Sequence, residues 1–189
     1  MKALLWFCLS FLFLNHTAHA EVWVSLSGPL SFQYSSPKNT LYQFDQSASV
    51  QAKGWSFLAK MGSFPLFGFS RFQLEAPPLN HAIKGTNHFE LQSSDIGLDL
   101  SGKTAKFLLG YGIGKLDFLC SQSDCQGLSF TQLELHQYFS QLGVPIGTHS
   151  DVHLDFRRII GRVQIKQANQ TDILHLQGVL TSVGFRLGF

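Results

Sequence analysis

The densest group of chemically capable side chains lies between residues 149 and 157. His149, Asp151, His153, Asp155 and Arg157 occupy every second position, and side chains two residues apart on a β-strand point to the same face. Histidine and aspartate at this spacing could share a metal ion or a proton. They could equally form ion pairs inside a narrow barrel, where buried charges must be paired. We favour the paired network and expect no metal. Three further residues are candidate partners: Glu134, His136 and Arg186.

The same segment does not predict nucleophilic catalysis. Ser150 stands beside His149 and Asp151, but adjacent strand residues point to opposite faces, so these three side chains cannot form a relay. We therefore expect no catalytic residues and no cofactor.

The elements that would position the 149–157 ladder are strands with one apolar face. Val152, Leu154 and Phe156 alternate with the ladder. From residue 22 the even positions read Val22, Val24, Leu26, Gly28, Leu30, Phe32 and Tyr34, whereas the odd positions are mostly small and polar. Such a period of two predicts β-strands. Less regular alternation covers 47–60, 66–76, 87–100, 106–114 and 128–140, and a change of parity between Phe130 and Leu133 predicts a β-bulge.

Seven turn signals divide the chain from residue 22 onward into eight strands in one all-β domain. They lie near 36–39, 62–65, 77–80, 101–103, 120–125, 143–145 and 167–170. Ten strands would fit the length but lack turn signals.

Composition indicates which strand face points outward. Only 14% of the 189 residues are charged, the net charge is +2, and 18 residues are Phe. This charge balance gives no reason to expect a nucleic-acid partner. Small polar and paired charged residues suit the interior of an eight-stranded barrel, whereas Val, Leu and Phe suit lipid. We predict a closed antiparallel up-and-down transmembrane β-barrel, with the excess Phe coating its outside.

The first twenty residues predict an export signal. Lys2 precedes the apolar run 3–14, and an Ala-His-Ala site ends at Ala20. We expect cleavage there, leaving 21–189 as the barrel; a retained anchor is the alternative. In an exported chain, Cys120 and Cys125 predict a disulfide across a loop. Metal binding by these thiols is the alternative.

The chain ends Val183-Gly-Phe185-Arg-Leu187-Gly-Phe189. This pattern resembles the C-terminal signature of bacterial outer-membrane barrels, and the whole mature chain resembles the small OmpX/OmpA-type eight-stranded barrels. The resemblance implies a multi-pass location in a Gram-negative outer membrane. It also implies that Val183, Phe185, Leu187 and Phe189 form an assembly signal for the barrel-assembly machinery.

The expected function is non-enzymatic: a monomeric outer-membrane barrel with a structural or surface-interaction role through short extracellular loops. Its expected partners are outer-membrane lipid and lipopolysaccharide. Arg157, Arg158 and Arg162 are candidates for lipopolysaccharide phosphates, or else for rim or lumen charges. Tryptophans and tyrosines suit interfacial girdles, with ligand binding as the alternative; they include Trp23, Tyr34, Tyr42, Trp55, Tyr111 and Tyr138. The alternatives are an enzyme that modifies lipid A acyl chains and a soluble exported ligand-binding barrel.

Overall fold

The computed structural model describes residues 22–35, 49–62, 64–76, 87–102, 105–119, 128–167 and 170–189. Nearly all of these residues belong to β-strands, which confirms the all-β prediction. The predicted signal peptide at 1–20 and the predicted Cys120–Cys125 disulfide lie outside the described residues and stay predictions. No helix in the described part of the chain has the length and apolar character needed to cross a membrane.

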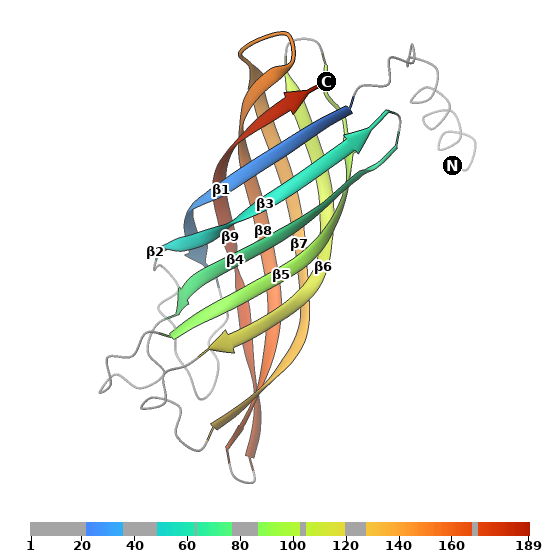
Figure 1. The fold of residues 1–189 in the computed structure, drawn as a ribbon. Coiled ribbons are helices and arrows are strands. Elements are labelled where there is room, and N and C mark those ends of the chain that lie inside the picture. Colours follow the sequence, from blue (N-terminus) through green and yellow to red (C-terminus); the bar gives the residue numbers. More distant parts are fainter. Residues whose placement is uncertain are drawn as a thin grey trace, which may run out of the picture.

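All described strands belong to one sheet. Their bounds are β1 Val22–Tyr34, β2 Ser49–Val50, β3 Ala52–Met61, β4 Leu66–Ala76, β5 Asn87–Asp99, β6 Lys106–Leu119, β7 Leu128–Pro145, β8 Ser150–Gln167 and β9 Gln170–Gly188. From β3 onward each strand pairs antiparallel with the next, and β1 pairs antiparallel with both β3 and β9. The β1–β9 pairing closes the sheet into a barrel (Figure 1).

The two-residue strand β2 does not widen this barrel. Both β2 and β3 pair with β1, and they occupy successive stretches of it: Val50 lies opposite Phe32, and Ser56 lies opposite Ser27. Only Gln51 separates β2 from β3. They are therefore two parts of one interrupted strand, and the predicted closed eight-stranded antiparallel barrel is confirmed.

A bulge in β1 corrects the predicted face of its second half. The register with β9 shifts between Pro29 and Ser31, and proline, which has no N–H for the ladder, commonly marks such a site. Beyond the shift the two faces exchange. Phe32 and Tyr34 were expected on the apolar outer face, yet they point into the lumen with 0% and 1% of their surface exposed.

The bulge predicted in β7 is present. Its register with β8 shifts between Gln132 and Leu135, where one extra residue is inserted. From Leu135 to the end of β7, the odd-numbered side chains, beginning with Leu135 and Gln137, point inward.

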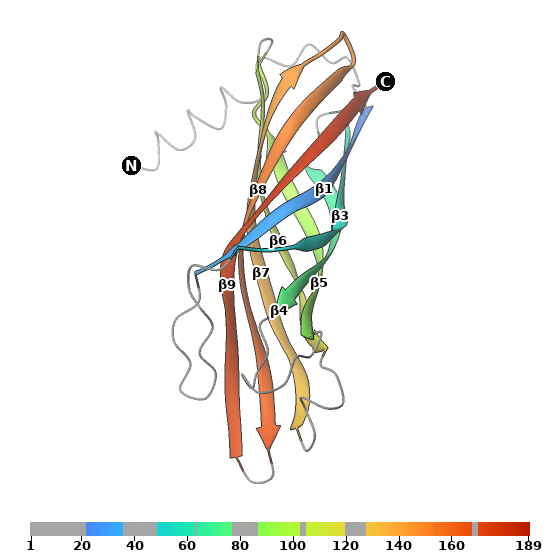
Figure 2. The same ribbon diagram turned by 90° about the vertical axis from the view of Figure 1, so that its left-hand side faces the viewer.

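Strands β7, β8 and β9 have 18, 18 and 19 residues, whereas a tilted strand crosses a bilayer with about 9–11. They reach farther than the other strands at one end of the barrel (Figures 1 and 2). We call this end, where β8 gives way to β9, the distal end. The opposite end, which holds the start of β1 and Phe189, is the proximal end. The turn predicted at 143–145 lies slightly later, because those residues still belong to β7.

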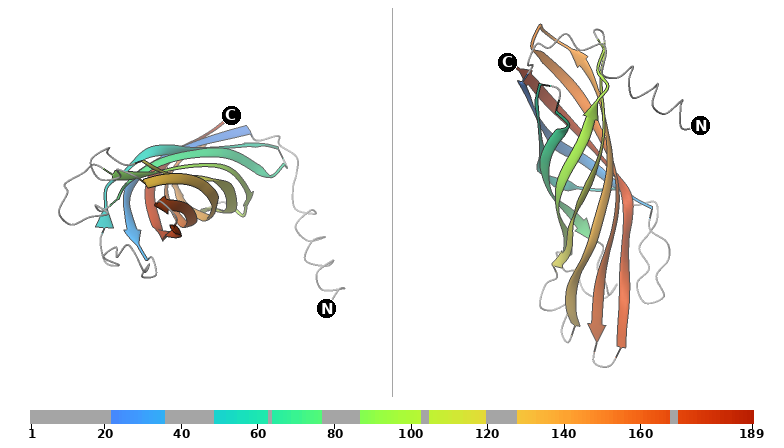
Figure 3. Two further views of the ribbon diagram at one scale, coloured as in Figure 1. Left: turned by 90° about the horizontal axis from the view of Figure 1, so that it is seen from below. Right: turned by 90° about the vertical axis from the view of Figure 1, so that its right-hand side faces the viewer.

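Figure 3 shows the strands winding around a common axis. Along this axis the side chains that fill the lumen change from mainly polar to apolar. The proximal lumen is mainly polar, with a small apolar cluster beside the polar groups: Trp23, Leu58, Leu66, Leu108 and Phe139. The distal lumen is a larger apolar core: Phe32, Tyr34, Phe72, Leu74, Phe89, Leu91, Leu116, Phe118, Leu135, Ile159, Val163, Ile165, Leu174, Leu176 and Leu180. The expectation that the Phe excess coats the outside is therefore wrong in part, because several Phe side chains fill this core.

The outer wall changes in the opposite sense. Proximal outward side chains are mainly large and apolar, and we call this zone the apolar band; Leu26, Phe69 and Leu98, for example, are about 60% exposed. Distal outward side chains are mainly polar or charged, with Leu119, Ile160 and Ile173 as large apolar exceptions. The change occurs on every strand of the wall: Leu30 to Gln33, Trp55 to Lys53, Phe69 to Arg71, Ile96 to Gln92, Ile113 to Lys115, Tyr138 to His136, Phe156 to Arg158 and Val179 to Gln177.

Candidate functional site

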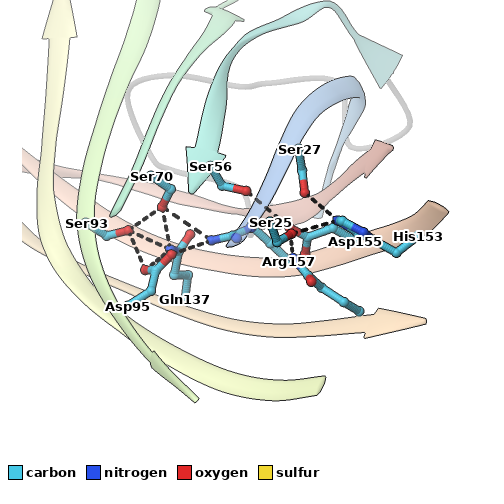
Figure 4. Close-up of polar contacts among 11 residues, drawn as sticks. Ser25, Ser27, Ser56, Ser70, Ser93, Asp95, Gln137, His153, Asp155 and Arg157 are labelled. Atoms are coloured by element: carbon cyan, nitrogen blue, oxygen red, sulfur yellow. Dashed lines mark hydrogen bonds and ion pairs between the residues drawn. The ribbon is translucent and has the colours of Figure 1, made fainter. Parts of the chain in front are cut away.

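Arg157 lies at the centre of the polar network in the proximal lumen, and its side chain is fully buried (Figure 4). Its Nη1 donates to Asp95 Oδ2 at 2.8 Å, and its Nε donates to Asp155 Oδ2 at 3.0 Å. Both carboxylates are also fully buried. Strand β8 supplies Arg157 and Asp155 from adjacent inward positions, and β5 supplies Asp95 from across the lumen. The guanidinium thus joins two walls of the barrel through charge-assisted hydrogen bonds.

Amide and hydroxyl groups surround this charge cluster. Gln137 Nε2 on β7 lies 2.8 Å from Ser70 Oγ and 2.5 Å from both Ser93 Oγ and Asp95 Oδ1. Ser93 also donates to Asp95 Oδ1 at 2.9 Å. On the other side of Arg157, Gln141 Nε2 donates to Asp155 Oδ2 at 3.2 Å. These groups lie on β4, β5, β7 and β8, so the network ties these four strands together across the lumen.

Small residues make the room that this network needs. Gly112 on β6 faces the lumen, and a Cβ at that position would collide with Asp95 Oδ1 and Gln137. A Cβ at Gly184 on β9 would likewise collide with the His153 ring and the Leu26 carbonyl oxygen. The glycine-rich alternation of β6 and β9 therefore serves the packing of the lumen.

His153 is buried in the lumen, between two serine side chains of β1 and the carboxylate of Asp151 on its own strand. Its Nε2 forms hydrogen bonds with Ser27 Oγ at 2.9 Å and Ser25 Oγ at 3.2 Å, while its Nδ1 lies 3.6 Å from Asp151 Oδ1. This order of groups resembles the nucleophile, base and orienting acid of hydrolases. However, all of these side chains are nearly fully buried, and the distance between His153 and Asp151 exceeds that of a hydrogen bond.

The proximal mouth of the lumen contains two further ion pairs. Arg186 Nε lies 3.4 Å from Asp151 Oδ2, and the Arg186 guanidinium stacks 4.5 Å from the centre of the Trp23 ring. Lys60 Nζ pairs with Asp99 Oδ2 at 2.8 Å, and Trp23 Nε1 donates to the same oxygen at 3.3 Å. Trp23 is thus a lumen residue, and the girdle position expected for it is wrong.

The network ends where the apolar core begins. Arg157 lies 4.8 Å from the ring centre of Phe139 and 5.5 Å from that of Phe72, so one guanidinium contacts both carboxylates and aromatic faces. Distal to it, Tyr34 donates to the Glu75 carbonyl oxygen at 2.7 Å. Burial in the distal core raises the pKa of Tyr34 well above its ordinary value of 10.0.

The structure brings together Asp151, His153, Asp155, Arg157 and Arg186, but it places the other predicted members elsewhere. His149 lies in the turn before β8 with an exposed side chain. Glu134 and His136 lie on the outer wall, where His136 Nδ1 and Tyr111 Oη are 2.5 Å apart. The β7 bulge is the physical reason for this correction, because it moves the even-numbered residues proximal to it from the lumen to the outside.

Sequence reasoning missed the partners on other strands, namely Ser25, Ser27, Ser56, Ser70, Ser93, Asp95, Gln137 and Gln141. The alternation along β5 could have identified Asp95 and Ser93 as lumen residues. Both share the parity of Phe89 and Leu91, so they lie on the buried face of β5. Among the described residues, no group of three or more His, Cys, Asp or Glu side chains could hold a metal ion.

Comparison with solved structures assigns a fold to the chain, whereas comparison with family models and curated proteins finds no match. Neisserial surface protein A (NspA) aligns with 92% of this chain and 100% of its own, with a TM-score of 0.60 and 10% identity. Outer membrane protein AlkL aligns over 93% of each chain, with a TM-score of 0.55 and 9% identity.

The N-terminal β-barrel domain of Pseudomonas aeruginosa OprF aligns over 92% of this chain and 100% of its own, with a TM-score of 0.51 and 9% identity. At 9–10% identity, these likenesses show the fold. The chain therefore has the fold of the small bacterial outer-membrane β-barrels, as the resemblance of its sequence implied.

Proposed function

We propose that this protein is an integral outer-membrane barrel with a closed lumen and a structural or surface-interaction role. The observation that carries the proposal is the filling of the lumen. Paired charges occupy its proximal half, and a continuous apolar core occupies its distal half. A barrel filled in this way has no continuous aqueous path for a solute, so transport through the lumen is not its role.

The exchange of polarity on the outer wall supports a definite orientation. Apolar side chains suit the hydrocarbon of a bilayer, and charged side chains there are costly. The apolar band therefore lies in the membrane, and the distal half stands outside it. With the chain termini in the periplasm, the distal half rises above the cell surface. The surface available to a partner is then the polar wall of β7, β8 and β9 as well as the loops.

Two measurements test this proposal. Cell fractionation should recover the protein in the outer membrane, and release into the periplasm without detergent would favour a soluble barrel. The purified barrel, inserted into planar bilayers, should give no stable conductance. A steady open channel would contradict a closed lumen.

Among the described residues, the Ser27–His153 contact favours an enzyme acting on lipid A acyl chains. Mass spectrometry of lipid A from cells with and without the gene tests this alternative. A change in acyl chains that disappears in the S27A variant would establish it and would overturn the non-enzymatic role. Retention of the change in S27A would place the chemistry elsewhere.

The C-terminal residues Val183, Phe185, Leu187 and Phe189 supply the proposed assembly signal. All four are exposed on the outer wall of the proximal half. Deletion of Phe189 should lower the amount of heat-modifiable barrel in the outer membrane, measured by gel mobility of unheated samples. An unchanged amount would show that the barrel-assembly machinery does not need this residue.

A further inference from the structure

A hollow in the outer wall lies just distal to the apolar band. It is lined by Gly114, Lys115, Gln132, Leu133, Glu134 and Arg162 from β6, β7 and β8. The β7 bulge lies within this lining, because the register with β8 shifts between Gln132 and Leu135. The extra residue bends the strand locally. The hollow is thus a consequence of backbone geometry.

Basic side chains outnumber acidic ones around the hollow. Lys115 and Arg162 line it, and Arg158 lies two outward positions closer to the apolar band on β8. Glu134 is the one carboxylate in the lining, and its Oε2 lies 3.1 Å from Arg162 Nη2. The next outward residue on β6 beyond Lys115 is Asp117, which accepts a hydrogen bond from Gln132.

The Arg162–Glu134 pair is weak enough to be exchanged. The Arg162 side chain is 47% exposed and that of Glu134 is 66% exposed, and ion pairs with this exposure contribute little to stability. An anion with more charge and more acceptor oxygens than a carboxylate would compete for Arg162. Phosphate meets both conditions, and guanidinium groups bind it through two parallel hydrogen bonds.

The position of the hollow selects the source of the phosphate. Ile113, the residue of the apolar band on β6, directly precedes Lys115 among the outward side chains of that strand. Beside it, Tyr111 and Tyr138 form a tilted ring pair with centres 5.2 Å apart, as expected at a membrane interface. A lipid with its acyl chains along the apolar band would therefore place its headgroup at the level of Lys115 and Arg162.

We propose that this hollow binds the phosphate of an outer-leaflet glycolipid headgroup through Arg162 and Lys115, with Arg158 adding positive charge. The proposal rests on the membrane orientation given above. It assigns Glu134 a competing role, because its carboxylate occupies Arg162 when no phosphate is present.

The experiment uses the full mature chain in nanodiscs of phosphatidylcholine that contain a minor share of diphosphoryl lipid A. Co-purifying lipid A is quantified by mass spectrometry after detergent extraction. R162Q and K115Q should each lower retention by about fivefold, the effect of one basic residue at a charged lipid surface. E134Q should raise retention, because it releases Arg162. K166Q, the same charge change about 13 Å farther along β8, is the matched control and should bind as the wild type does.

Heat-modifiable gel mobility distinguishes failure of the phosphate site from failure of the proposed membrane barrel. A variant that keeps this mobility has kept the membrane barrel, whatever its lipid retention. Equal losses in R162Q and K166Q would show general charge attraction and would overturn the site. Lower retention in E134Q would also overturn it, since the carboxylate would then assist binding. Equal retention of dephosphorylated lipid A by the wild type would show that phosphate is not the recognised group.

Discussion

The proximal and distal halves of this barrel use the same strands but place polar and apolar side chains on opposite sides of the wall. Strand β8 shows the difference without a break in its alternation. Its inward residues are charged or polar from Asp151 to Arg157 and apolar from Ile159 to Ile165, while the outward side changes at Arg158 from apolar to mainly polar. Solvent on the outside explains this exchange. Where the outer face contacts lipid, its side chains are apolar and the polar groups face the lumen. Where the outer face contacts water, its side chains are polar and the apolar groups form a core inside.

The two halves also differ in how much one side chain matters. A large apolar side chain in the distal core has many equivalent neighbours, so its contacts are spread over the cluster. Arg157 is instead the shared partner of two buried carboxylates in the proximal lumen. The proximal half is therefore more vulnerable to a single substitution that removes charge.

The largest expected effect follows from that vulnerability. R157A leaves Asp95 and Asp155 buried without their cation, and breaking a buried pair in this way costs about 3–5 kcal/mol of unfolding free energy. The matched control is the triple variant D95N/D155N/R157M, which removes all three charges together and should cost much less. Urea unfolding in phospholipid vesicles measures both. If the single variant is as stable as the triple one, the charges of the proximal lumen are not desolvated.

A second prediction tests the outer wall of each half with one residue type. Val183 and Thr171 both point outward from β9, Val183 in the apolar band and Thr171 near the distal end. V183R should lower the unfolding free energy by about 2–4 kcal/mol if it lies near the bilayer midplane, whereas T171R should change it by less than about 1 kcal/mol. Urea unfolding in vesicles measures both. Equal losses would show that the exchange of polarity does not mark the membrane boundary.

The same comparison shows what the sequence could predict. Alternation in 151–157 and 179–189 predicted the faces of β8 and β9 correctly, because the parity of those strands is unbroken. Phe32 and Tyr34 were assigned to the wrong face because a single inserted residue exchanges the faces of a strand. Glu134 and His136 were misplaced for the same reason. A change of parity indicates that a bulge is present, as it did in β7, but the register with β8 or β9 decides which side of the bulge keeps its face.

The partners of Arg157 were hidden for a different reason. Asp95 lies 62 residues earlier in the chain, and nothing in either segment encodes which of the eight strands face each other across the lumen. Strand count and parity restrict the candidates to inward polar residues. Closure of the barrel and the stagger of its strands then decide the pairs, and these are properties of the whole sheet.

The smallest expected effect concerns an ion pair on the distal outer wall, the exposed counterpart of the Arg157 pairs. Arg71 Nε donates to Glu90 Oε1 at 2.7 Å, and this hydrogen bond, outweighing partial burial, lowers the pKa of Glu90 below 4.5. Because the folded pKa is lowered, the pair stabilises the barrel above the ordinary carboxyl pKa. That stability is lost as the pH falls through the lowered value.

The Arg71 side chain is 60% exposed, so we expect R71Q to lower the unfolding free energy by only about 0.5 kcal/mol at neutral pH. At a pH below the folded pKa of Glu90, wild type and R71Q should unfold at the same urea concentration, because the carboxyl group is then neutral in both. A loss in R71Q that persists in acid would mean that Arg71 stabilises the barrel through a contact other than Glu90. A loss as large as that of R157A would mean that the distal wall is shielded from water, and the contrast between the two halves would then fail.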